Sequence, residues 1–132
     1  MKYIITLAIA LFGSAEKVQA QQLSVRSGDH PNFSRLTIPI SRKQNWTAYQ
    51  GAEGVYLELP GHSDGFSVDG VFSRMKRARI SDIVVEDNNL MLQVSCDCNS
   101  TVFRDGELLV IDVVDEGTPL AAEPLKGPSL QQ

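Results

Sequence analysis

Beyond residue 20 the chain lacks any apolar run approaching the roughly 20 residues that a membrane-spanning helix needs. It also lacks a basic excess, because 12 Lys and Arg stand against 16 Asp and Glu, and an acidic chain is a poor partner for nucleic-acid phosphates. Histidine occurs only as His30 and His62, both in polar stretches typical of turns. We therefore expect neither a nucleic-acid binder nor a span after the N-terminal segment.

The sequence also lacks the side chains of a hydrolytic centre. Ser63 and Asp64 directly follow His62, and three consecutive loop residues cannot form the relay of nucleophile, base and orienting acid. Separated pairs of His and Glu, which would bind the zinc of a wall-cleaving amidase, are missing as well. We expect a protein that is not an enzyme and needs no cofactor.

Residues 1 to 20 have the composition of a secretory signal peptide. Lys2 provides a positive start, residues 3 to 12 are apolar, and Val18 and Ala20 form a V-x-A cleavage pattern. No Cys follows Ala20, so a lipid anchor at the new N-terminus is not expected. We predict one folded domain over residues 21 to 114 and a Pro-containing linker or tail over residues 115 to 132.

An internal repeat dominates the folded part. Residues 36 to 59 and 90 to 113 read as one segment written twice without a gap, at an offset of 54. Leu36 falls on Leu90, and the acidic Glu58 falls on Asp112. Such a repeat indicates a unit too small to bury its own apolar face, doubled so that the copies bury each other.

Apolar and polar residues alternate through both copies, which is typical of half-buried strands. Pro39 is expected on an edge strand or at a position without a ladder bond, Asp105 and Gly106 as a two-residue hairpin turn, and residues 71 to 75 as one helical turn. The pattern predicts an all-β fold with four strands per copy and eight in all, over residues 23–26, 36–40, 47–50, 55–59, 79–85, 90–94, 101–104 and 108–114.

Two strands end in an apolar-acid-apolar motif: residues 55 to 61, Val-Tyr-Leu-Glu-Leu-Pro-Gly, and residues 109 to 113, Leu-Val-Ile-Asp-Val. With the segment at 71 to 80 between them, they resemble the AMIN domain, the amidase N-terminal module of bacterial envelope proteins, over roughly residues 22 to 114. The resemblance implies a periplasmic β-sandwich of two pseudo-symmetric four-stranded halves. It also implies a non-catalytic module that binds peptidoglycan, or targets a partner to the cell wall, and therefore peptidoglycan or an envelope protein as its partner.

Two groups of side chains are candidates for ligand binding. A cluster of four basic residues is a candidate for holding anionic groups such as stem-peptide carboxylates, although charge runs usually form a solvated face. Carbohydrate recognition also needs aromatic platforms, and the candidates for these are Trp46, Tyr49 and Tyr56. The basic group consists of Arg74, Lys76, Arg77 and Arg79.

Cys96 and Cys98 are the only cysteines of the chain. Fully extended backbone would hold their Cα atoms nearly 7 Å apart, at the limit for a disulfide, so a bridge requires a bend between them. An exported chain meets oxidants, which favours a disulfide; buried free thiols and a soft-metal or redox site are the alternatives.

Two other functions are compatible with the sequence. One is a protein-interaction scaffold of an envelope assembly, in which a partner adds a strand to an open sheet edge and the tail acts as a tether. The other is a small redox or metal module built on Cys96 and Cys98.

Overall fold

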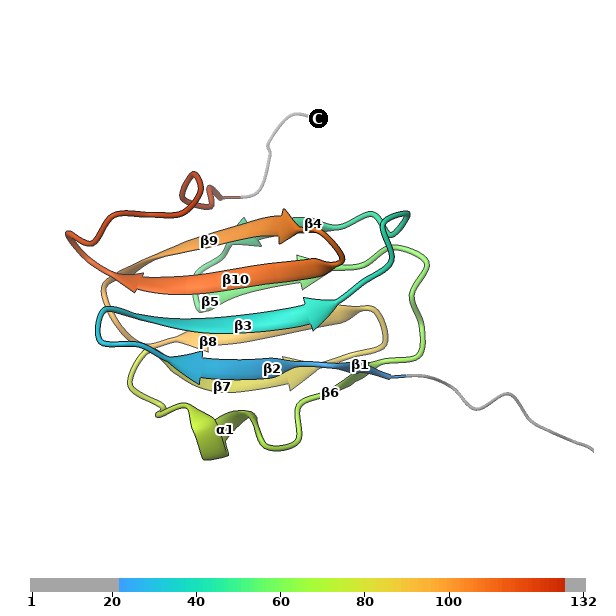
Figure 1. Cartoon of the computed structure of the whole chain (residues 1–132), viewed down its shortest axis with the longest axis horizontal. Helices are drawn as coiled ribbons and strands as arrows, with labels where there is room; N and C mark the ends of the chain where they lie inside the picture. The colour runs from blue at the N-terminus through green and yellow to red at the C-terminus, as the bar shows by residue number, and fades with distance from the viewer. Residues whose placement is uncertain (1–21, 128–132) are drawn as a thin grey trace, which may run out of the picture.

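The computed structural model describes residues 22 to 127, as two four-stranded antiparallel sheets that pack face to face (Figure 1). The predicted all-β sandwich is therefore confirmed. The predicted signal peptide lies outside the described residues. Sheet I has the order β2 (Arg26–Asp29), β3 (Phe33–Pro39), β10 (Leu108–Asp115) and β9 (Cys98–Asp105). Sheet II has the order β4 (Thr47–Gln50), β5 (Gly54–Glu58), β8 (Asn89–Val94) and β7 (Ile80–Val85).

Short elements close the side of the sandwich where β2 and β7 lie (Figure 1). Strand β1 (Leu23–Ser24) pairs in parallel with β6 (Phe66–Ser67), and α1 (Val71–Arg74) is a single turn, close to the predicted residues 71 to 75. The turn is held against β2 because Ser27 Oγ donates to the Val71 carbonyl at 2.6 Å. No helix within residues 22 to 127 is long and apolar enough to cross a membrane.

Each sheet takes two strands from each copy of the repeat. In sheet I, Leu36 pairs with Ile111, and in sheet II, Leu90 pairs with Leu57. These two pairs are related by the offset of 54, which also relates β3 to β8 and β5 to β10. The copies are therefore intertwined through a pseudo-two-fold arrangement, and do not lie as one half beside the other.

Strand alternation divides each sheet into a buried inner face and an outer face. The inner faces bury branched aliphatic side chains between the sheets, which is the main source of favourable free energy in a sandwich of this size. The fully buried members include Leu36, Ile38, Val55, Leu57, Leu90, Leu92, Leu109, Ile111 and Val113.

One local prediction is confirmed by the backbone in its second alternative, and one is corrected. Pro39 lies on an interior strand, not an edge, but β2 pairs with β3 only as far as Thr37, so Pro39 occupies a position without a ladder bond on that side. The second hairpin turns at Gly106 and Glu107, one residue later than predicted, because Asp105 still pairs with Leu108. Gly106 supplies the positive φ of 64° that this turn requires.

The segment after β10 is bound to the sandwich over part of its length, not solvated throughout as predicted. It runs along the side of the sandwich where β9 and β4 lie (Figure 1). The Leu125 N–H donates to the Ser100 carbonyl at 2.7 Å, and the Gln50 N–H donates to the Lys126 carbonyl at 2.7 Å. Leu125 also packs against the core. The segment thus bridges one edge strand of each sheet.

Candidate glycan-binding face

A row of ring and apolar side chains crosses the outer face of sheet II. Tyr49 on β4 is paired with Tyr56 on β5, Tyr56 with Met91 on β8, and Met91 with Val84 on β7. The row is perpendicular to the strands, because cross-strand partners point to the same side of a sheet. Tyr49 and Val84 are 38% and 42% exposed, which is unusual for large apolar side chains in register. We call these four residues the tyrosine row.

The Tyr49 and Tyr56 rings stack on each other in parallel. Their ring centroids lie 5.1 Å apart and their planes differ by only 5°. The Tyr56 ring covers Gly51, where an added Cβ would lie only 2.2 Å from the ring atom Cε1. The absence of a side chain at Gly51 therefore leaves room for the Tyr56 ring beside Tyr49.

The tyrosine row lines an open hollow of about 350 Å³ on sheet II. Polar groups come from Glu58 on β5 and from Glu86 and Asn89 at the β7–β8 hairpin. Among the described residues, no Lys or Arg lines the hollow, and neither carboxylate belongs to an ion pair. The site therefore combines a stacking surface with hydrogen-bond acceptors and a net negative charge.

The repeat identifies a counterpart of this acidic group on sheet I. There, Arg35 is paired with Asp112, and its Nε and Nη2 donate to the two carboxylate oxygens at 2.7 and 2.8 Å. This bidentate pairing raises the pKa of Arg35. Asn89 stands at the repeat position of Arg35, opposite Glu58. The acid is thus kept in both sheets, whereas the cation is replaced by a neutral amide in sheet II.

The predicted binding residues do not gather in one place. Tyr56 lies in the tyrosine row, but Trp46 is half-buried and packs against the core. Arg74 and Lys76 are exposed, and Arg77 stacks on Phe72 with its Cζ 3.8 Å from the ring centroid. None of the basic residues lines the hollow of the tyrosine row.

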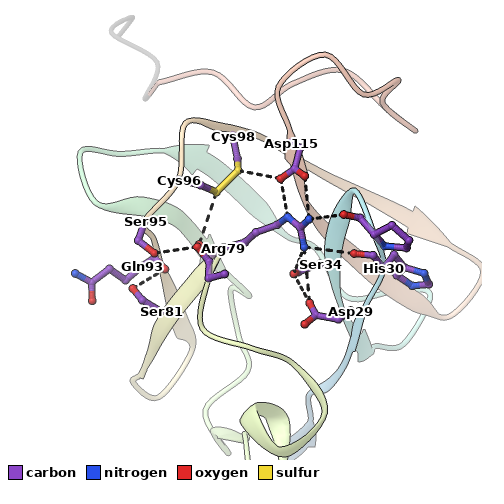
Figure 2. The surroundings of a disulfide bond; sticks show 12 residues. Asp29, His30, Ser34, Arg79, Ser81, Gln93, Ser95, Cys96, Cys98 and Asp115 are labelled. Atoms are coloured by element: carbon purple, nitrogen blue, oxygen red, sulfur yellow. Dashed lines mark hydrogen bonds and ion pairs between the residues drawn. A yellow bond between two sulfur atoms is a disulfide. The ribbon is translucent and has the colours of Figure 1, made fainter.

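Arg79, the fourth basic residue, is only 14% exposed at its side chain and serves the fold. Figure 2 shows its guanidinium between Asp115 and the β2–β3 turn, where Nε donates to Asp115 Oδ1 at 2.7 Å and Nη2 to the Pro31 carbonyl at 2.8 Å. Hydrogen bonding by Arg79 lowers the pKa of Asp115. Burial raises the pKa of Asp29, but the Ser34 hydroxyl, the Lys76 N–H and the charge of Arg79 outweigh it, so the net shift is downward.

Cys96 and Cys98 form a disulfide, as predicted (Figure 2). The chain bends between β8 and β9, which brings the two Cα atoms to 5.2 Å, within the ordinary range for a bridge. The sulfur of Cys98 lies 3.9 Å from Asp115 Oδ1, and that of Cys96 lies 4.0 Å from the Arg79 carbonyl oxygen. The bridge therefore lies beside the ion pair of Arg79 and Asp115.

Within residues 22 to 127, no group of three or more His, Cys, Asp or Glu side chains is placed to hold a metal ion. Comparisons with protein-family models, with curated proteins and with solved structures find no match for this chain.

Sequence reasoning missed Val84, Glu86, Asn89 and Met91 as members of the hollow. They come from the second copy, and pairing of β5 with β8 brings them beside Tyr56. One signal was present in the repeat itself. Glu58 falls on Asp112 and Asn89 on Arg35, so the loss of a cation opposite a retained acid can be read from the offset alone.

Proposed function

We propose that this protein is a non-catalytic, periplasmic module that binds the glycan of the cell wall through the tyrosine row of sheet II. The observation that carries this proposal is the stacked pair of the exposed Tyr49 and the half-buried Tyr56 in an open hollow with Glu58, Glu86 and Asn89. Sugar rings present apolar C–H faces that stack on aromatic rings, while their hydroxyl groups donate to carboxylate and amide oxygens.

The resemblance to the AMIN domain supports the same proposal, since it implies peptidoglycan as the ligand. A flat face on a rigid sheet also suits a polymer strand, which needs an open surface and not an enclosed pocket. Of the three aromatic platforms predicted from the sequence, Tyr49 and Tyr56 carry this proposal, whereas the Trp46 ring packs against the core.

Co-sedimentation with purified peptidoglycan sacculi tests the proposal. Replacing both Tyr49 and Tyr56 with Ser should weaken binding by about five- to 150-fold, because each stacking contact contributes roughly 0.5 to 1.5 kcal/mol. Replacing both with Phe keeps the rings and should retain most of the binding. Leu108→Ser, which alters a similarly exposed apolar side chain on sheet I, serves as the control.

A second variant separates the tyrosine row from the basic group. Replacing Arg74, Lys76 and Arg77 with Ser removes three exposed charges outside the hollow and should leave most of the sedimentation intact. If this variant loses binding and the double Tyr→Ser variant keeps it, the site lies at the basic group. If the parent protein does not sediment with sacculi, the proposed function is wrong.

A further inference from the structure

The pseudo-two-fold symmetry places an acid at equivalent positions of the two sheets, Asp112 in sheet I and Glu58 in sheet II. On sheet I, the Asp112 carboxylate is 2% exposed, and it is matched by the guanidinium of Arg35. That guanidinium lies between two rings, with its Cζ 5.3 Å from the centroid of Phe33 and 5.9 Å from that of Phe103. Sheet I therefore has a complete cation site, built from an acid and aromatic faces and filled by the protein itself.

On sheet II the same site keeps its acid and one of its two rings but has no cation, since Asp87 stands at the repeat position of Phe33. Glu58 takes the place of Asp112, Tyr49 the place of Phe103, and Asn89 the place of Arg35. Glu86 adds a second carboxylate to the hollow. Carboxylates beside stacked tyrosine rings attract a cationic group, and they repel the carboxylates of an anionic ligand.

On the basis of the proposed function, we infer that the glycan bound by the tyrosine row carries free amino groups. The hollow takes glucosamine units in preference to N-acetylated units. One sugar unit packs against the stacked pair of Tyr49 and Tyr56, and its ammonium group pairs with Glu58 at the place that Arg35 fills on sheet I. Tyr56 and Glu58 are two residues apart on one strand face, roughly 7 Å, so a single sugar unit reaches both.

Matched sugars test this inference directly. Chitosan and chitin oligosaccharides of equal length differ in the acetyl group on the amine. We expect the chitosan oligosaccharide to bind the full chain at least about threefold more tightly at about pH 6, where amines are protonated, as an exposed ion pair allows. Glu58→Gln should abolish this preference, while Glu107→Gln, which removes the same charge at the turn of sheet I, should keep it.

A gain-of-pair variant sharpens the test. Asn89→Arg places a guanidinium opposite Glu58, as Arg35 lies opposite Asp112, and it should remove the preference for the amine-bearing sugar. Asn89→Ala, which supplies no cation, should retain the preference. Calorimetric titration of these variants, together with their unfolding curves, separates a filled site from an unfolded protein.

Several outcomes overturn the inference. Equal affinity for the two sugars would show that the amino group is not recognised. The proposed glycan-binding function would still stand if sacculi bind through the tyrosines. A lysine oligopeptide that competes as well as the chitosan oligosaccharide shows that the face accepts any polycation. If neither sugar binds, the inference fails, and the sacculi experiment then decides separately whether the proposed function fails with it.

Discussion

Asp112 and Glu58 occupy the same position in the two copies of the repeat and lie in opposite environments. Asp112 is buried under the Arg35 guanidinium, whereas Glu58 is exposed beside the tyrosine row. Because the backbone register is the same around both acids, the difference arises from the side chains and from what covers each face. In one copy the acid is paired with a cation of the chain itself, and in the other it faces solvent.

The largest expected effect is a loss of stability when the ion pair of Arg35 and Asp112 is broken. Arg35→Ala leaves the Asp112 carboxylate buried without its cation, and we expect a loss of about 2 to 3 kcal/mol in the free energy of unfolding. Asn89→Ala, at the repeat position on the open face, should cost less than about 0.5 kcal/mol. Urea unfolding of both variants checks the contrast. Equal losses would mean that the two faces contribute alike.

A second prediction concerns the segment that covers the β9 edge. Ser100 stands at the repeat position of Trp46, and Leu125 packs against the core next to it, so Leu125 supplies apolar volume that Ser100 lacks. Leu125→Ala should cost about 1 to 2 kcal/mol, since the side chain is half-buried. Leu108→Ala, on an exposed side chain, should be close to neutral in the same unfolding assay.

The two copies differ at the end of one strand. The second copy has the disulfide of Cys96 and Cys98 where the first copy has Arg42 and Gln44. The bridge closes a very small ring, and it therefore removes little entropy from the unfolded chain. A double Cys→Ser variant should still fold and lose well under the roughly 3 kcal/mol expected for a bridge that closes a loop of about 15 residues. Native mass spectrometry should show two hydrogens missing from the parent. Two alkylatable thiols in the native protein would contradict the bridge.

The smallest effect concerns the network of Arg79, which has no counterpart, because its repeat position is the buried Val25. The pKa values of Asp29 and Asp115 are lowered in the fold, so their contribution to stability is present above the unfolded-state pKa of about 3.9. It is lost as the pH falls through the lower folded values. Arg79→Gln should therefore make the unfolding free energy less steep with pH in this acidic range. An unchanged slope would assign the acid sensitivity to other carboxylates.

Much of the fold was predictable because alternation and the repeat are local signals. Most strand positions, the helical turn at Val71 and the bend at Cys96 follow from neighbouring residues, but the predicted strand over residues 23–26 falls on β1 and only the start of β2. Alternation states which side of a strand is buried, but it does not state which strand is its neighbour. The exchange of strands between the copies was therefore not predicted, and the site that depends on it was predicted only at Tyr49 and Tyr56.

Trp46 illustrates the same limit of sequence-based prediction at a single residue. Its size and its replacement by Ser100 in the other copy suggested an exposed ring. In the fold, Trp46 shares the parity of Ala48, and both pack against the core. The position of Ser100 is compensated by Leu125, which lies far along the chain and outside the repeat. Sequence comparison of the copies alone cannot reveal such compensation.

The exchange of strands also fixes the order in which the protein can assemble. Strand β3 pairs with β10, so Leu36 meets its partner Ile111 only after nearly the whole domain has been synthesised. Contacts of such long sequence separation slow folding, because a large loop must close before pairing stabilises it. Neither copy is a folding unit by itself. Completion of sheet I therefore depends on β10, the last strand of the domain.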